Sequence, residues 1–118
     1  MARRPVGALE KDILRVIWAA DRPLTPGQVV ERLGLGLAYT SVATVIGRLY
    51  SKDLLVRMKS GRGYEYTAAM TEPELAARMI GRVLDSSADR RAAMTGFVSG
   101  LSRRDAKALR QMLDDLEQ

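Results

Sequence analysis

The chain has 118 residues, of which 47% are hydrophobic and 28% are charged, so it suits one globular domain or one small domain with an appendage. Its formal net charge is +5, and it contains no cysteine and no histidine. These absences exclude disulfides and thiolate metal sites and remove the commonest metal ligand and general base, so we expect no enzyme, metal site or cofactor.

The positive charge is concentrated in the first part of the chain. Residues 1–70 hold 11 Lys and Arg against 6 Asp and Glu, whereas residues 71–118 hold 8 of each. The whole net charge of +5 therefore belongs to residues 1–70. Such a segment indicates a polyanionic partner such as nucleic acid, although basic domains without one are also common.

The first predicted elements are two short helices. Residues 7–20 repeat apolar side chains with helical spacing, which predicts an amphipathic helix. A second helix is expected over residues 26–33, with Thr25 as its N-cap and Gln28 as the capping-box partner. Gly34 is expected to end it. The inward positions of the first helix are Leu9, Ile13, Val16, Ile17 and Ala20.

Residues 39–51, "YTSVATVIGRLYS", combine β-branched residues that favour strands with the spacing of a helix. On a helical wheel, one arc is wholly apolar, and the opposite arc holds small hydroxyl residues, a glycine and two cations. We therefore predict a helix held by tertiary packing against its own propensity. The inner arc consists of Val42, Val45, Ile46 and Leu49, and the outer arc of Thr40, Ser41, Thr44, Gly47, Arg48, Ser51 and Lys52.

The periodicity changes from 3.6 to 2 over residues 54–69, which predicts a β-hairpin that turns at residues 60–63. We expect Arg57 and Lys59 on the outer face of this hairpin and Arg62 at its tip. Two short helices, a third helix and a basic hairpin follow one another in the order of a winged helix-turn-helix. The predicted fold is therefore mainly α with a small β-hairpin, and the winged helix-turn-helix DNA-binding domain spans residues 1–70.

Residues 71–118 predict three more helices. Thr71 with Glu74, then Ser87, then Ser102 with Asp105 are their expected N-terminal caps. Three such helices have too little core to be stable alone, so we expect a helical dimerisation domain in a homodimer; the alternative is that they fold back on the first domain. The expected dimerisation residues are Leu75, Met79, Ile80, Val83, Leu84, Phe97, Leu101, Leu109, Met112, Leu113 and Leu116.

The sequence also bears on the membrane. No run of about 18 apolar residues is present, and the first twelve residues hold two arginines but no apolar segment after them. We therefore expect a cytoplasmic protein without direct membrane insertion.

The stretches "LEKDILRVIW", "TPGQVVERL" and "AYTSVATVIGRLYSKDLLVRMKSGRGYEYTA", followed by the capped helical tail, resemble the penicillinase repressor family of BlaI/MecI type. The resemblance covers nearly the whole chain and is most specific over residues 39–66. It implies a dimeric winged-helix repressor on an inverted-repeat operator of double-stranded DNA. It further implies control of β-lactamase or related resistance genes and release through a membrane-bound sensor protease activated by a β-lactam. Other members regulate unrelated genes.

The resemblance also implies where a protease would cut. Family members controlled by proteolysis are cut in the tail before a phenylalanine and after an asparagine, and the matching pair here is Gly96 and Phe97, without the asparagine. Phe97 can equally be a core residue of the dimer interface. A copper-responsive branch uses C-terminal cysteine pairs, which this chain lacks, so copper sensing through thiolates is excluded.

In a winged helix-turn-helix, the second helix of the helix-turn-helix motif lies in the major groove. Short side chains on this helix let its backbone come close to the DNA. Residues 39–51 would be this recognition helix, and the hairpin tip would contact a phosphate or the minor groove. A winged helix can also be a protein-interaction module without DNA, and a salt titration separates the two. The expected DNA-binding residues are Tyr39, Thr40, Ser41, Ala43, Thr44, Gly47, Arg48, Lys52, Arg57, Lys59 and Arg62.

Overall fold

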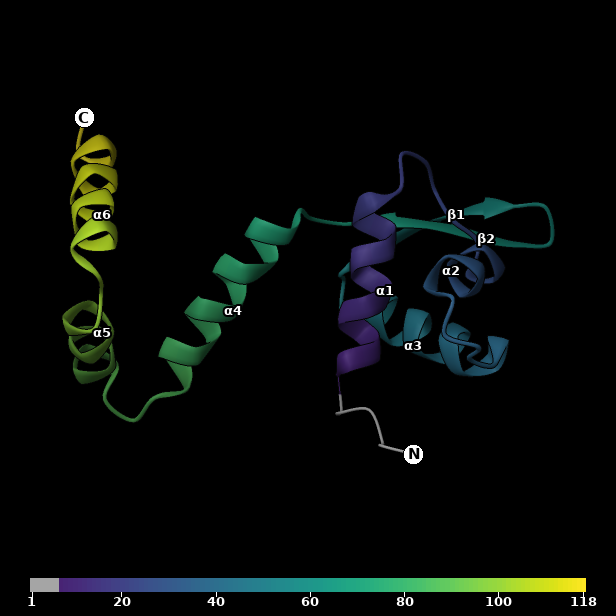
Figure 1. Ribbon diagram of the computed structural model, residues 1–118, viewed down its shortest axis with the longest axis horizontal. Coiled ribbons are helices and arrows are strands. Elements are labelled where there is room, and N and C mark those ends of the chain that lie inside the picture. The colour runs from purple at the N-terminus through teal and green to yellow at the C-terminus, as the bar shows by residue number, and fades with distance from the viewer. Residues whose placement is uncertain (1–6) are drawn as a thin grey trace. The chain divides into compact units, whose positions relative to one another are not determined.

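The computed structural model describes residues 7–118, which form six helices and one two-stranded hairpin (Figure 1). The predicted fold class, mainly α with a small β-hairpin, is confirmed. The chain divides into two compact units, Met1–Leu75 and Ala76–Gln118. Arg3 and Arg4, which contribute to the basic charge of the first segment, lie outside the described residues. The elements are α1 (Ala8–Ala19), α2 (Pro26–Leu33), α3 (Tyr39–Ser51), β1 (Leu55–Ser60), β2 (Gly63–Ala68), α4 (Glu72–Ser86), α5 (Arg90–Ser99) and α6 (Arg103–Leu116).

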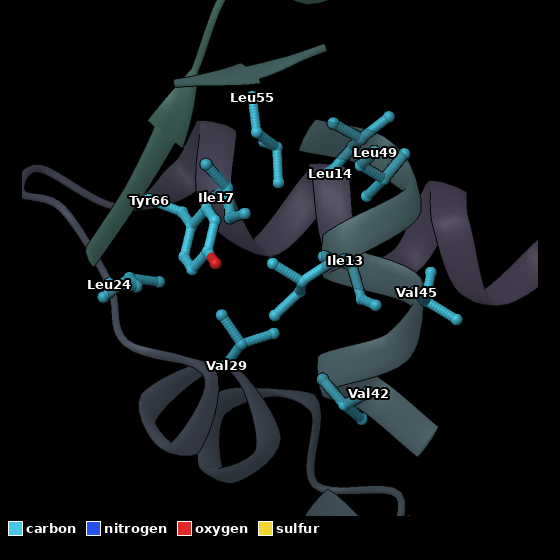
Figure 2. Close-up of a cluster of buried hydrophobic side chains, with 11 residues drawn as sticks. Ile13, Leu14, Ile17, Leu24, Val29, Val42, Val45, Leu49, Leu55 and Tyr66 are labelled. Atoms are coloured by element: carbon cyan, nitrogen blue, oxygen red, sulfur yellow. The ribbon is translucent and has the colours of Figure 1, made fainter. Parts of the chain in front are cut away.

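A single hydrophobic core holds the first unit together, and its side chains converge from α1, α2, α3 and the hairpin (Figure 2). The inner arc predicted for α3 is confirmed, because all four of its residues are buried. Burying a Val, Leu or Ile side chain contributes about 1.5–3 kcal/mol, which exceeds the few tenths of a kcal/mol that a β-branched residue costs in a helix. The core consists of Ile13, Leu14, Ile17, Leu24, Val29, Val42, Val45, Ile46, Leu49, Leu55 and Tyr66.

The inward face predicted for α1 is confirmed in part. Ile13 and Ile17 are buried as expected, whereas Leu9, Val16 and Ala20 are only partly buried at the edge of the core. Leu14, which the predicted set omitted, is also buried. The indole Nε1 of Trp18 donates to the backbone oxygen of Met70 at 2.9 Å, which ties the end of α1 to the segment that follows β2.

The ends of α2 and α3 are set by local hydrogen bonds. The predicted capping box of α2 is confirmed: Thr25 Oγ1 accepts from the Gln28 amide at 3.2 Å, and Gln28 Oε1 accepts from the Thr25 amide at 2.9 Å. Gly34 ends α2 with a left-handed φ of 62°. At the end of α3, Asp53 takes the left-handed conformation, and the amides of Asp53 and Leu54 donate to carbonyls of the last turn. This Schellman motif turns the chain sharply into β1.

Backbone hydrogen bonds, as well as side-chain packing, join the hairpin to the helices. Leu24, just ahead of α2, pairs with Tyr66 of β2 through two backbone hydrogen bonds of 2.7 and 3.0 Å. Because a two-stranded hairpin is marginally stable by itself, this third short partner and the core beneath it keep β1 and β2 in place.

The two faces of the hairpin differ from the prediction. The register places Arg57 and Lys59 on the face of Leu55, which is buried, and Val56 and Met58 on the opposite face, where they are 50% and 49% exposed. The expectation that Arg57 and Lys59 lie on the outer face was therefore wrong. Burial of Leu55 determines the phase of the alternation, and shifting that phase by one residue exchanges the faces.

The second unit is built from the rest of α4 together with α5 and α6, and none of these three helices has a buried residue. The capping box of Thr71 with Glu74 and the Ser102 cap are confirmed. The Ser87 cap of α5 was wrong: Asp89 is the N-cap and accepts from the Ala92 amide at 3.0 Å. The Ser87 hydroxyl is instead occupied by the backbone of Asp89. Within residues 7–118, no helix is both long and apolar enough to span a bilayer.

The α2 capping box generates a stability prediction. Thr25→Ala removes one acceptor for the helix amides and is expected to lower the free energy of unfolding by about 1 kcal/mol. Thr25→Ser keeps the hydroxyl and serves as the matched control, with a change of a few tenths of a kcal/mol. Urea denaturation followed by circular dichroism measures both, and equal losses in the two variants would contradict the capping role.

Candidate nucleic-acid interface

The outer face of α3 is a solvent-exposed surface of small polar residues. Its inner arc is fixed in the core, so the side chains on the opposite arc face solvent. Tyr39 at the start of α3 is 55% exposed, whereas Ala43 is partly buried. The exposed residues of this surface, which we call the α3 face, are Tyr39, Thr40, Ser41, Thr44, Gly47, Arg48 and Ser51.

The centre of the α3 face is low and lacks long side chains. The Thr44 hydroxyl donates to the Thr40 carbonyl at 2.8 Å, so its hydrogen is occupied within the helix. At Gly47 a Cβ atom would meet no other atom within 4 Å, so packing inside the protein does not require a glycine there. The absence of a side chain at Gly47 instead opens the helix backbone to a partner that approaches from outside.

The hairpin presents a cation at its tip. The turn between β1 and β2 consists of Gly61 and Arg62, and Gly61 has a φ of +59°, as the first position of a type II′ turn requires. Arg62 is exposed. Lys59, two residues before the turn, is exposed as well. We call the hairpin of residues 55–68 the wing. The tight turn places Arg62 at its tip.

Arg57 has a different environment from the other wing cations. Its guanidinium carbon lies 4.2 Å from the ring centroid of Tyr50 and 4.1 Å from that of Tyr64. The sequence prediction missed both tyrosines as partners of Arg57. The alternation in β2 could have indicated Tyr64, because it lies on the same face one diagonal step away, whereas nothing in the one-dimensional pattern of α3 indicates Tyr50.

Lys52 is also engaged within the protein. Its Nζ contacts the Glu10 carboxylate at 3.0 and 3.3 Å, which links the end of α3 to the start of α1. The predicted set placed Lys52 among the DNA-binding residues on the basis of the helical wheel alone. In the structure Lys52 lies at the C-cap of α3, and its charge is partly neutralised by Glu10.

A groove lies between the start of α3 and the hairpin. It has a volume of about 360 Å³ and receives residues from the start of α2, from α3 and from both strands. The partly buried Ala43 is one of its lining residues and is not part of the exposed α3 face. The lining residues are Thr25, Pro26, Tyr39, Ala43, Ser60, Gly63, Tyr64 and Tyr66.

The second unit exposes apolar residues along all of its helices. Val83 of α4 is 69% exposed, Phe97 of α5 is 58% exposed and Leu116 of α6 is 82% exposed. Leu75, at the end of the first unit, packs instead against the core of α1–α3 and the hairpin. Gly96 and Phe97 lie inside α5, where both carbonyls accept from the Gly100 amide. The other exposed apolar residues here are Met79, Ile80, Met94, Val98, Met112 and Leu113.

A family model and two curated relatives agree on the family of this chain. The model of the family described as "Penicillinase repressor" matches residues 6–115. The chain is similar to the protein named "Transcriptional regulator BlaI" in two strains of Mycobacterium tuberculosis, CDC 1551 / Oshkosh and ATCC 25618 / H37Rv. Each is 34% identical over 117 residues, which cover 95% of this chain and 85% of the relative. Among solved structures, the transcriptional regulator Tm0710 from Thermotoga maritima is 24% identical with a TM-score of 0.49, over 93% of this chain and 72% of that chain.

The Glu10–Lys52 pair generates a prediction about charge at the interface. Glu10→Gln removes the carboxylate that neutralises Lys52, so affinity for double-stranded DNA at low salt is expected to rise about two- to threefold, with a steeper salt dependence. Because exposed ion pairs contribute about 0–1 kcal/mol, the unfolding free energy should change little. Fluorescence anisotropy at several salt concentrations measures the affinity.

The matched control is Glu31→Gln, which changes the net charge equally from α2 and leaves the Lys52 pair intact. An equal rise in both variants would show that net charge alone acts, and that Lys52 is not held back by Glu10.

Proposed function

Because this chain belongs to the penicillinase repressor family and is a DNA-binding transcriptional repressor rather than an enzyme, we propose that it binds an inverted-repeat operator as a homodimer. In this proposal α3 enters the major groove of each half-site and the wing contacts the flanking backbone. The observation that supports it most is the α3 face: a helix whose apolar arc is buried presents short hydroxyl residues, a bare glycine and Arg48 to solvent.

The chemistry of the α3 face suits recognition of base edges. Hydroxyl groups and threonine methyls contact base edges and thymine methyls, and arginine is the commonest partner of guanine. Gly47 lets the helix backbone approach the groove floor, a role that fits the open space around this position. We therefore assign sequence recognition to Thr40, Ser41, Thr44 and Arg48.

The wing suits contacts with the phosphate backbone. Arg62 lies at the exposed tip, and Lys59 lies on the same hairpin. Such contacts hold a protein in register on the duplex without carrying sequence information. The excess of cations over acids in residues 1–70 favours the same partner. A protein-interaction module would lack the steep salt dependence that these contacts produce.

Two substitutions distinguish sequence recognition by α3 from contacts of the wing with the DNA backbone. Thr44→Glu is expected to lower affinity for the operator at least about tenfold and affinity for scrambled DNA much less, because it fills the low centre of the α3 face. Arg62→Ala should weaken both duplexes to a similar degree and lower the salt slope by roughly one unit per monomer. Binding isotherms on both duplexes at several salt concentrations measure these effects, with the operator first located by footprinting upstream of the chain's own gene.

A matched variant, Thr44→Gln, has the size of Thr44→Glu without its charge and separates steric exclusion from repulsion. Thr44 is exposed, so neither substitution disturbs the core. If operator preference survived in Thr44→Glu, the assignment of α3 as the recognition helix would be overturned.

The homodimer is proposed to form through residues 76–118. Their three helices expose a series of large apolar side chains and bury none, and a surface of this kind is the expected interface of an obligate dimer. Two linked heads also gain effective concentration on two half-sites. Leu75, by contrast, contributes to the core of the first unit and is not needed in the interface.

Dimerisation is tested on the full chain by sedimentation. We expect the unmodified protein to be a dimer, and Val83→Glu to raise the dissociation constant by at least about 100-fold because it would bury an unpaired charge. Val56→Glu, on an equally apolar and 50% exposed position of the wing, is the control and should stay dimeric. A monomeric unmodified chain, or equal dissociation of both variants, would contradict this interface.

Control of β-lactamase or related resistance genes and release by a sensor protease stay predictions that derive from the family. Cleavage between Gly96 and Phe97 would require α5 to open locally, because a protease needs an extended substrate and these two residues are helical. The carbonyls of both residues accept from Gly100 near the end of α5, where helices open most readily. Regulation of unrelated genes is the alternative that a footprint would identify.

A further inference from the structure

One arginine of the wing connects all three elements of the candidate interface. Tyr50 belongs to α3, Arg57 to β1 and Tyr64 to β2. The Arg57 guanidinium lies close to both rings, at 4.2 and 4.1 Å from their centroids. The faces of aromatic rings attract cations, so each contact is favourable, and the planar guanidinium is suited to contact with two rings. We call this set of three side chains the Arg57 stack.

The Arg57 stack is anchored in the core at one end. The Tyr50 ring meets the Tyr66 ring edge to face, with centroids 6.5 Å apart and an interplanar angle of 77°. Tyr66 is buried, and its backbone is paired with Leu24. The stack therefore extends from the fixed end of α3 to the wing, where Arg57 and Tyr64 are both exposed.

The geometry distinguishes Arg57 from Arg62 and Lys59. Arg62 is exposed in the turn between β1 and β2, whereas Arg57 is in contact with rings from two other elements. A wing and a helix that bind one duplex together must be held at a defined angle before binding, because ordering them on the DNA would cost affinity. A two-stranded hairpin has little stiffness of its own.

We propose that Arg57 is a positioning residue for DNA binding: it fixes the wing on α3 through Tyr50 and Tyr64 and makes no phosphate contact of its own. This inference rests on the proposed function and adds a role for a residue that the sequence pattern had grouped with the DNA contacts. It also explains why arginine rather than lysine occupies position 57, since a compact ammonium cannot cover two ring faces as a plane does.

The test compares four variants of the full chain: Arg57→Met, Arg57→Lys, Tyr64→Leu, and Arg57→Met combined with Tyr64→Leu. Arg57→Met is expected to weaken binding to the footprinted operator about tenfold, from the loss of both cation–π contacts and the order that they impose. Tyr64→Leu removes only one of the two contacts and is expected to weaken binding about three- to fivefold. The double variant should lose no more than Arg57→Met alone, because removal of Arg57 already breaks the contact with Tyr64. The salt slope should stay that of the unmodified protein, and Arg57→Lys should recover only part of the affinity.

Arg62→Ala is the control for a phosphate contact, because it is expected to lower the salt slope by roughly one unit per monomer. If Arg57→Met lowered the slope as much, and its effect added to that of Tyr64→Leu, Arg57 would be a phosphate contact and the proposal would be overturned. Binding losses that merely follow losses in thermal stability would overturn it as well.

A measurement without DNA separates this proposal from the proposed function. Amide hydrogen exchange over residues 55–68 should accelerate in Arg57→Met and Tyr64→Leu, while exchange in α1 and α3 stays slow. Unchanged exchange in the hairpin would refute the positioning role whether or not the protein binds DNA. If the unmodified chain bound neither the operator nor other duplexes, the proposed function would be refuted instead. The role of the stack in recognition would be refuted with it.

Discussion

The structure depends on the burial of one face of α3. Its β-branched residues favour an extended chain, and only the core formed with α1, α2 and the hairpin keeps them helical. Because the inner arc is fixed by packing, the outer arc is fixed as well, and the α3 face is exposed as a rigid surface. A recognition helix needs this rigidity, since base-edge hydrogen bonds tolerate little change in geometry.

The same core also determines where the wing lies. Leu55 and Tyr66 pack into it, and Leu24 adds a backbone pair beside Tyr66, so the hairpin begins from a fixed base. Beyond this base the Arg57 stack continues the contact between the wing and α3 toward solvent. The cations of the candidate interface thus fall into two groups. Arg48, Lys59 and Arg62 are proposed for DNA, whereas Lys52 contacts Glu10 and Arg57 contacts two tyrosines.

The two units differ in how many side chains they bury. The first unit has eleven buried side chains drawn from five elements and from the segment before α2, which is a complete core for a small domain. In the second unit helix caps and helical spacing are well formed, yet α4, α5 and α6 bury nothing. Local signals are sufficient to form such helices, but their apolar faces require a partner, which is the physical basis of the proposed homodimer.

The sequence by itself determined the features that depend on neighbouring residues: the helical arcs of α3, the capping boxes at Thr25 and Thr71, and a hairpin that turns within residues 60–63. The cap expected at Ser87 was wrong, because the local backbone places Asp89 at the N-cap of α5. The tertiary structure decided which face of the hairpin is inner, because Leu55 and Val56 are equally apolar and the core beneath selects one phase. It also decided the partners of Lys52 and Arg57, since Glu10, Tyr50 and Tyr64 come from separate elements and long-range contacts leave no periodic signal in the chain.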